Sequence, residues 1–420
     1  MIKLIKILFL VFIFLFSIIW TYENTDKIDS IKGKIKKIIK KEPKVSETII
    51  NENIIDSFNV EANGYDIEIN KIIDFKEKTA FVLYEVKENF FDVRNIKIFL
   101  QNGFLISADK FNKLTLNKNY TLEFNGGIKS VFFYNSEVYG LVTSNKNDCY
   151  YVSIVNLNTG DELFNSDCLP SINDEDVIDL SGSGSSIIDE DDYVLISIGT
   201  PTTNSTNIEL LAQNKVSYFG KILKIKKSEL IINNKLKPEI FSIGHRNPQG
   251  MTKFDSDYFS VEHGPKGGDE LNKIIESKNY GWPIVSFGTK YLYDENGLSY
   301  NKDHETQGFE PPLYAFIPSV GISSLNNCPS VLKNYYKKNC LIALSLNGNN
   351  LQQGNSLIIF LLNNKKDAVQ SVEKIFIKSN YALRHFLTDK KNNIFEDEDG
   401  SIFISVDSKG IYRFKFKNLR

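Results

Sequence analysis

The feature that most restricts the fold is a succession of short apolar runs from about residue 60 to the C-terminus, with no long helical period between them. The runs are rich in β-branched and aromatic residues, and clusters of Asn, Asp, Gly and Lys separate them, which favours strands joined by turns. Examples are Thr79–Val86, Ile96–Leu100, Val131–Tyr134, Val138–Val142, Tyr193–Ile198, Tyr218–Ile225, Leu341–Leu346, Ser356–Leu362, Ile402–Val406 and Ile411–Phe416. Strands at this density, without helices to build βαβ units, predict a closed or radially repeated antiparallel sheet.

Two acidic turns favour radial repetition. The turn Asp189–Asp192 precedes an apolar strand at Tyr193, and Glu396–Gly400 precedes another at Ser401. Six four-stranded blades would use about 60 residues each, which is near the repeat lengths of known propellers once insertions are added. We therefore predict an all-β fold, a six-bladed β-propeller over residues 59–420, preceded by an N-terminal hydrophobic helix.

Composition excludes a broad electrostatic surface for nucleic acid. The chain has 50 Lys+Arg against 52 Asp+Glu, a formal net charge of -2, whereas a nucleic-acid footprint needs a clear basic excess. Only five of the basic residues are arginines, at positions 94, 246, 384, 413 and 420. In a chain that otherwise uses lysine, an arginine marks a position where a planar, bidentate donor is needed.

The first 22 residues have the pattern of a secretory signal or an N-terminal anchor. Lys3 and Lys6 precede an apolar stretch from Ile7 to Trp20. Counted from Leu4, the stretch is near the lower limit of about 17 residues for a membrane span, and the bulky Ile18–Trp20 stands where a cleavage site would be expected. We expect an uncleaved anchor; a cleaved peptide and a buried core helix are the alternatives. The body would then be exported, on the periplasmic side of the inner membrane.

Residues 23–58 are predicted to form a lysine-rich stalk or linker. Eight lysines lie between Lys27 and Lys44, and isoleucines recur there at near-helical spacing. This pattern suits an amphipathic helix or stalk on anionic lipid, so the membrane is an expected partner. A solvated linker that ends at Pro43 fits equally well.

The four cysteines are placed in two local pairs. Cys149 and Cys168 flank two short strands joined by the turn Asn158–Asp161, so antiparallel pairing would bring their ends together. Cys328 and Cys340 flank a second short segment in the same way. We predict two disulfides, which suits an oxidising compartment; free buried thiols are the alternative.

The segment from Ile243 to Tyr291 concentrates residues that carry chemistry. It reads G-H-R-N-P-Q-G-M, then V-E-H-G-P-K-G-G-D-E-L-N, then K-N-Y-G-W-P. Arg246 beside Asn247 offers a forked donor and an amide, which suit a carboxylate-bearing ligand. A turn at Gly264-Pro265 can direct carbonyl oxygens at a hard cation, and Asp269-Glu270 adds carboxylates nearby, as Ca²⁺ requires. A turn-rich loop with solvated charges is the alternative.

This string resembles the glucose/sorbosone dehydrogenase family, the pyrroloquinoline-quinone (PQQ) dependent glucose/aldose sugar dehydrogenases, which are soluble quinoproteins with a six-bladed propeller. Further matches are Gly220–Ile225 after Ala212-Gln213, and Pro318–Gly321. The strong similarity covers about 80 residues, and weaker similarity of blade-like strands extends over roughly 170–416.

The resemblance assigns four residues to the quinone. Arg246 and Asn247 match quinone-binding positions, and Arg384 matches the second arginine of an R-x-R clamp near the last blade. Ser319 corresponds to a hydroxyl contact. The cofactor implied by the resemblance is PQQ.

The resemblance also assigns calcium sites. Gly264 and Pro265 would hold the catalytic Ca²⁺ through backbone oxygens. Glu270 and Tyr280 match positions that the family uses around a structural calcium ion.

Several positions depart from the family pattern. The family's base histidine corresponds to Ser181, and a hydroxyl does not accept a proton at neutral pH; Asp179 is a weak substitute. Thr200 replaces an aspartate at the end of the next strand. Ala382 replaces the first clamp arginine, and Asn347 replaces a quinone-facing lysine.

The sequence therefore predicts a quinoprotein sugar dehydrogenase-like protein that oxidises aldose C1 with PQQ and calcium. Loss of a general base reduces such a reaction by about 10²–10⁴-fold. The alternatives are a non-catalytic propeller that binds a carbohydrate or a protein on the same scaffold, and a structural envelope protein whose loop only binds Ca²⁺. A sugar or another small molecule is the expected ligand.

Overall fold

The computed structural model describes residues 49–50, 56–85, 91–108, 110–147, 149–170, 178–202, 205–231, 235–294, 297–346 and 354–419. The chain divides into two compact units, Met1–Glu47 and Thr48–Arg420, and the described residues belong to the second. The expected N-terminal helix and most of the expected linker lie outside the described residues. Within the described residues, no helix has the length and apolar character needed to cross a membrane.

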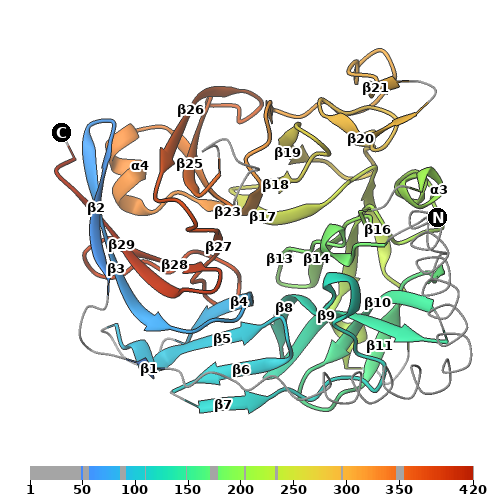
Figure 1. Ribbon diagram of the computed structural model, residues 1–420, viewed down its shortest axis with the longest axis horizontal. Coiled ribbons are helices and arrows are strands. Elements are labelled where there is room, and N and C mark those ends of the chain that lie inside the picture. The colour runs from blue at the N-terminus through green and yellow to red at the C-terminus, as the bar shows by residue number, and fades with distance from the viewer. Residues whose placement is uncertain are drawn as a thin grey trace, which may run out of the picture. The chain divides into compact units, whose positions relative to one another are not determined.

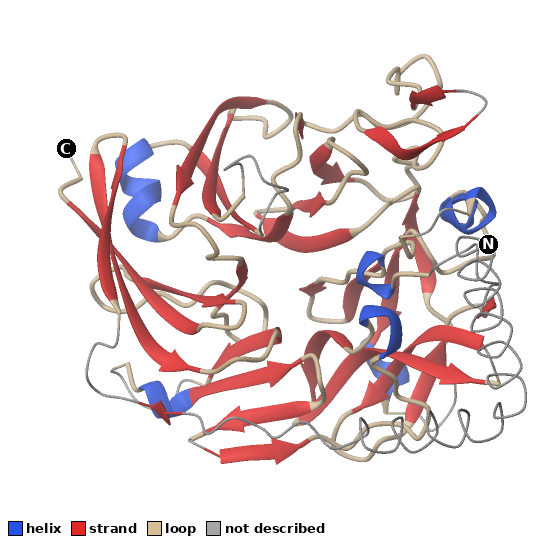
Figure 2. Ribbon diagram, in the orientation of Figure 1, coloured by secondary structure: helices blue, strands red, loops and turns tan. Residues whose placement is uncertain are grey.

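Six antiparallel sheets surround one axis, so the second unit is a six-bladed β-propeller, as predicted (Figure 1). The innermost strands of neighbouring blades contact one another in a closed ring, in the order β4, β8, β13, β17, β23, β27 and back to β4. Figure 2 shows how little of this unit is helical.

Each blade has four main strands, which follow one another outward from the axis. Blade 1 consists of β4 (Thr79–Tyr84), β5 (Ile96–Leu100), β6 (Phe104–Ser107) and β7 (Lys110–Lys113). Blade 2 consists of β8 (Ile128–Tyr134), β9 (Glu137–Lys146), β10 (Cys149–Asn156) and β11 (Glu162–Asn165), with β12 (Leu169–Pro170) added to β10. Blade 3 consists of β13 (Ile187–Asp189), β14 (Tyr193–Ile198), β15 (Lys221–Lys226) and β16 (Glu239–Ile243).

Blades 4 to 6 repeat this plan. Blade 4 consists of β17 (Pro248–Phe254), β18 (Asp257–Glu262), β19 (Asp269–Ile274) and β22 (Tyr314–Phe316), and the hairpin β20 (Thr289–Asp294) and β21 (Gly297–Ser299) is inserted in it. Blade 5 consists of β23 (Ile322–Asn327), β24 (Asn339–Ser345), β25 (Ser356–Leu362) and β26 (Val369–Phe376). Blade 6 consists of β27 (Leu383–Phe386), β28 (Ile402–Val406), β29 (Gly410–Lys417) and β3 (Tyr65–Asp74).

The last blade joins the two ends of the propeller unit. Strand β3 pairs antiparallel with β29, and Ile69 lies opposite Phe414. Two further strands, β1 (Ile49–Ile50) and β2 (Ser57–Ala62), pair with β3. Because an N-terminal strand completes a C-terminal sheet, the ring closes by hydrogen bonding between distant parts of the sequence.

Helices in the described residues are short. The α-helices are α3 (Thr206–Glu209) and α4 (Ser330–Tyr336). The 3₁₀ turns are η1 (Val93–Asn95), η2 (Glu123–Asn125), η3 (Leu180–Gly182), η4 (Leu210–Ala212) and η5 (Lys227–Leu230).

The blades pack face to face, which explains why many runs are continuously apolar instead of alternating. Every residue of β4 is buried, and in β25 only Leu361 is not fully buried. Phe360 of β25 contacts Tyr314 and Phe316 of blade 4, with ring centroids 6.1 and 5.9 Å apart. A strand covered on both faces needs apolar side chains on both.

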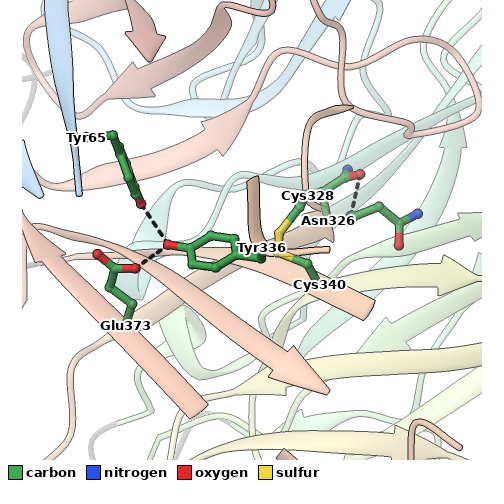
Figure 3. Close-up of a disulfide and its surroundings, with 7 residues drawn as sticks. Tyr65, Asn326, Cys328, Tyr336, Cys340 and Glu373 are labelled. Atoms are coloured by element: carbon green, nitrogen blue, oxygen red, sulfur yellow. Dashed lines mark hydrogen bonds between the residues drawn. A yellow bond between two sulfur atoms is a disulfide. The ribbon is translucent and has the colours of Figure 1, made fainter. Parts of the chain in front are cut away.

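Both predicted disulfides are confirmed. Cys149–Cys168 connects the start of β10 to the segment that precedes β12, and Cys328–Cys340 connects the end of blade 5's inner strand to β24. Figure 3 shows the second disulfide beside Tyr336, whose hydroxyl donates to Glu373 and lies 3.1 Å from the hydroxyl of Tyr65.

One predicted strand begins late. The apolar run Tyr218–Ile225 predicted a strand from Tyr218, but β15 begins at Lys221. Gly220 has φ +67°, a left-handed conformation that ends the preceding turn. The Lys221 ammonium is buried and donates to the carbonyl oxygens of Leu211, Ala212 and Phe219 at 2.7–2.8 Å, which ties this turn to η4.

Candidate functional site

A polar cavity of about 690 Å³ lies where the inner ends of the blades meet, and residues from all six blades line it. Its charged lining residues are four cations and two acids: Lys78, Lys129, Arg246, Arg384, Glu77 and Asp179. A chain with a nearly balanced charge thus places an excess of positive charge around one cavity. Such a cavity suits an anionic ligand.

Arg246 lies in this wall directly before β17. Its guanidinium lies 5.2 Å from the ring centroid of Trp282, and its Nη1 donates to the carbonyl oxygen of His263 at 3.0 Å. Its backbone N–H donates to Oε2 of Glu262 at 2.8 Å. These contacts fix the arginine with part of its fork facing the cavity.

Asn247 connects this wall to the turn that carries Ser181. Its Oδ1 accepts a hydrogen bond from the backbone N–H of Gly184 at 3.0 Å. A Cβ on Gly184 would lie 2.1 Å from that oxygen, so the close approach requires glycine. The structure therefore brings together the expected quinone residues and the position of the missing histidine.

Ser181 and Asp179 both line the cavity. Oδ1 of Asp179 accepts from the backbone N–H of Ser181 at 2.8 Å and from Nδ2 of Asn125 at 3.0 Å. Asp179 thus caps η3 and links blade 3 to blade 2. Ser181 is exposed, and no histidine occupies its place.

Asp269 holds the Gly264 turn against the segment that contains Ser319. Its Oδ1 accepts from the N–H of Gly264 at 3.0 Å. Its Oδ2 accepts from three consecutive N–H groups, those of Val320, Gly321 and Ile322, at 3.0, 2.6 and 3.1 Å. The sequence pattern suggested a cation ligand at Asp269, but its carboxylate is fully engaged by backbone donors.

Gly264 lines the cavity, and Pro265 packs beside Gly288. A Cβ on Gly264 would lie 2.2 Å from the carbonyl oxygen of Gly268, so the tight turn requires glycine. Ser319 itself does not line the cavity, but its Oγ is buried with no hydrogen-bond partner in the described residues.

Glu270 lies beside a second, small cavity of about 10 Å³, with Glu262 and Tyr280 in its wall. Burial, together with the nearby Glu262 carboxylate, raises the pKa of Glu270 well above its usual range. Glu262 is held by Nδ1 of His245 at 3.1 Å and by Nδ2 of Asn272 at 2.8 Å. The carboxylates of Glu262 and Glu270 repel each other, and binding of a proton or a cation between them removes that repulsion.

Tyr280 contributes no free hydroxyl. The hydroxyl donates to the carbonyl oxygen of Lys273 at 2.7 Å and accepts from the N–H of Ile275 at 2.9 Å. A cation ligand at this residue would have to be its backbone oxygen. Within the described parts of the chain, no three His, Cys, Asp or Glu side chains are grouped as a metal site.

Arg384 lines the large cavity from blade 6. It forms a bidentate ion pair with Asp407, in which Nε donates at 2.6 Å. Burial, with a contribution from Arg384, lowers the pKa of the neighbouring His385 to about 3, so this histidine is neutral. Asn347, the position of the family's lysine, lies outside the described residues.

Sequence reasoning missed most of the other cavity residues, among them the titratable Glu77, Lys78, Lys129 and His385. Lys78 and Lys129 belong to blades 1 and 2, where the sequence has no recognisable motif. The one local signal is the Gly126-Gly127 pair directly before β8, since paired glycines allow a loop to approach a ligand.

These features define a class of protein, a six-bladed propeller whose inner loops enclose one polar, cation-rich cavity. Residues 132–413 match the family model described as Glucose / Sorbosone dehydrogenase. The chain belongs to that family.

Curated relatives match parts of the chain. Aldose sugar dehydrogenase YliI of Escherichia coli is 29% identical over 151 residues, 34% of this chain and 39% of that protein. Quinoprotein glucose dehydrogenase B of Acinetobacter calcoaceticus is 35% identical over 101 residues, 23% of this chain and 20% of that protein. The matches thus span less than half the length of these relatives.

Solved structures agree over most of the propeller. The apo-form of the soluble aldose sugar dehydrogenase of Escherichia coli superposes with a TM-score of 0.62 at 20% identity, over 84% of this chain and 99% of that one. The PQQ-bound aldose sugar dehydrogenase of Streptomyces coelicolor gives 0.51 at 16% identity, over 85% and 100%. At these identities the likeness establishes the fold.

Proposed function

We propose that this protein is a quinoprotein sugar dehydrogenase that oxidises C1 of an aldose with PQQ and calcium. The observation that carries the proposal is the cavity itself. It gathers Arg246, Asn247, Gly264 and Arg384, which the family's motif distributes over three segments of the chain. Membership of the glucose/sorbosone dehydrogenase family and the activity for which the relative from Escherichia coli is named support it.

Unsatisfied polar atoms support a ligand in this place. Nε2 of His263, a residue of the cavity wall, and Oγ of Ser319 are buried without a partner in the described residues. Buried polar groups normally find partners, so these two atoms suit a polar ligand. Arg246, Asn247 and Arg384 would bind the carboxylates and carbonyls of PQQ, which when bound supplies an o-quinone that accepts a hydride. Ser319 lies outside the cavity lining, so its hydroxyl would contact the quinone only from behind that lining.

The oxygen donors suit calcium. The carbonyl oxygens of Gly264 and Pro265 would form the catalytic site, where a hard cation polarises an oxygen of the ligand. The Glu270 carboxylate and the backbone oxygen of Tyr280 would form the structural site. The unpartnered Oδ1 of Asn272, whose Nδ2 contacts both Glu262 and Glu270, is a further oxygen donor there.

The proton-accepting step is the weak point of this site. Ser181 cannot hold the proton of the sugar hydroxyl, and Oδ1 of Asp179 already accepts two hydrogen bonds. Only Oδ2 of Asp179 remains to accept it. We therefore expect turnover about 10²–10⁴-fold below that of an enzyme with a histidine at position 181, and we expect Ser181→His to raise it.

A quinone titration of the full-length protein tests this function. Fluorescence should report Ca²⁺-dependent PQQ binding at micromolar concentration or tighter, followed by oxidation of an aldose with an electron acceptor. Arg246→Gln should weaken PQQ binding at least tenfold, because it removes a charge-assisted pair. Arg413→Gln is the matched control, since Arg413 pairs with Asp397 away from the cavity.

No binding at millimolar PQQ would refute the proposal. Binding without oxidation of any aldose would instead identify a non-catalytic carbohydrate- or protein-binding propeller.

We also propose that the propeller is exported and anchored by its N-terminal segment. The apolar stretch from Ile7 to Trp20 and the two disulfides support an oxidising, exported location. Protease added to intact spheroplasts should digest the propeller; protection from protease would count against it.

A further inference from the structure

The two halves of the cavity differ in origin. Blades 4 to 6 supply Arg246, Gly264 and Arg384, which the family motif predicts. Blades 1 and 2 supply Lys78 and Lys129, which lie before residue 132, where the family match begins. Both lysines thus lie outside the residues that the family model matches.

Lys129 lies beside the turn of the missing histidine. It is the second residue of β8, and its Nζ donates to the backbone oxygen of Asn125 at 2.9 Å. The side chain of Asn125 in turn donates to Asp179, which caps the turn at Ser181. This chain of contacts places the Lys129 ammonium at the side of the cavity where the family takes a proton from the sugar.

Asp179 is near enough to act on the Lys129 charge but forms no ion pair with it. The bonded partner of Lys129 is a carbonyl oxygen, and no ion pair to Lys129 or Lys78 is found among the described residues. Arg384, which also lines the cavity, already pairs with Asp407. Lys129 is partly buried and Lys78 is exposed, and both line the cavity. An anion that enters the cavity would be attracted by both charges.

The charges that face Lys129 support this. Burial lowers its pKa to about 7; Asp179 opposes the shift, and the positive Arg384 and Lys78 add to it. Glu77, from blade 1, is the other acid in the wall. The negative charge of a ligand beside Lys129 and Lys78 would therefore be attracted by both lysines.

We propose that Lys129 and Lys78 bind the anionic group of an acidic sugar, so that the substrate is a monosaccharide with a carboxylate or a phosphate. This inference rests on the proposed function, because it names the substrate class of the same cavity. The quinone residues of blades 4 to 6 would hold the cofactor, and blades 1 and 2 would select the sugar.

Calorimetry of the full-length protein without cofactor tests the proposal, with glucose, glucuronate and glucose 6-phosphate as probes. At pH 6.5 at least one of the two anions should bind at least tenfold more tightly than glucose, and the tighter one identifies the group. Lys129→Gln should weaken that anion about tenfold to a hundredfold and leave glucose unchanged, because one charge-assisted bond is lost. Lys129→Arg should restore most of the affinity.

Lys110→Gln is the control for net charge, since Lys110 is exposed on the outer strand β7. A thermal unfolding curve for each variant checks that it is folded.

The pH dependence gives a second readout. The anion binds the protonated amine, so its affinity should fall as pH rises above about 7, and binding should take up a proton in that range. Calorimetry in buffers of different ionisation enthalpy measures that uptake. Glucose should show neither effect.

Three results would overturn the inference: equal affinity for glucose and both anions, no binding of either anion at millimolar concentration, or a Lys129→Gln variant that weakens PQQ but not the anion. Its failure is separate from that of the proposed function. If the protein oxidises glucose without preferring acidic sugars, the substrate inference is refuted and the quinoprotein function stands. If it binds acidic sugars but not PQQ, the quinoprotein function is refuted and the anion site stands.

Discussion

At the residue scale, Asp269 connects two separate segments of this site. Its two carboxylate oxygens accept four backbone N–H groups from two separate segments, Gly264 and Val320–Ile322. The side chain is buried, so these charge-assisted bonds form away from water, where they are strong. The position of the Gly264-Pro265 carbonyls therefore depends on Asp269.

We expect Asp269→Asn to destabilise the protein by about 3–5 kcal/mol. The amide keeps the shape but has one oxygen instead of two, and its NH₂ faces backbone donors, which leaves buried N–H groups unpaired. Urea unfolding followed by tyrosine and tryptophan fluorescence measures the loss. Asp367→Asn, in an exposed turn, is the control. An Asp269→Asn variant as stable as that control would contradict the scaffold role.

The sequence alone grouped those candidate residues that lie close together in the chain. Arg246, Asn247 and Gly264 stand in one string, so their shared location needed no knowledge of the fold. Lys129 and His385 could not be placed, because they reach the cavity only when the ring of inner strands closes. A lysine in a strand otherwise indicates a solvated face, and only the closed ring shows that Lys129 faces a cavity.

At the element scale, apolar runs predicted strands and their order well, because strands covered on both faces are continuously apolar. The pairing of β3 with β29 could not be read from local pattern, since it joins residues far apart in sequence. The exact ends of strands could not be predicted, because they are set by the conformation of single turn residues. Gly220, for example, delays the start of β15.

The two disulfides should differ in their response to reductant. Cys328 and Cys340 are fully buried, whereas Cys168 is exposed. Thiol exchange requires access of the attacking thiolate to a sulfur. Mild dithiothreitol under native conditions, followed by alkylation and mass spectrometry, should label Cys149 and Cys168 and leave the other pair intact. In urea both pairs should be labelled. Equal labelling of both pairs in the native protein would contradict the burial argument.

At the scale of the whole molecule, the cavity exists because the ring is closed. Six innermost strands contact one another in sequence, and β3 supplies the final strand of the blade that begins with β27. Residues of blade 1 and blade 6, such as Lys78 and Arg384, face the same cavity although they lie at opposite ends of the propeller sequence. Stability and ligand binding should therefore depend together on this closure.

Removal of β29 tests the closure. A chain that ends at Lys409 loses the strand between β28 and β3, which exposes Ile69, Phe403 and other buried residues. We expect loss of the cooperative thermal transition and strong binding of a hydrophobic dye, because an unpaired sheet edge and an open core remain. A chain that ends at Lys417 keeps all of β29 and should unfold like the full-length protein. A synthetic peptide of residues 410–417 added to the shorter chain should restore part of the transition, since the missing pairing partners are backbone groups. A shorter chain that still unfolds cooperatively would show that the ring does not need this strand.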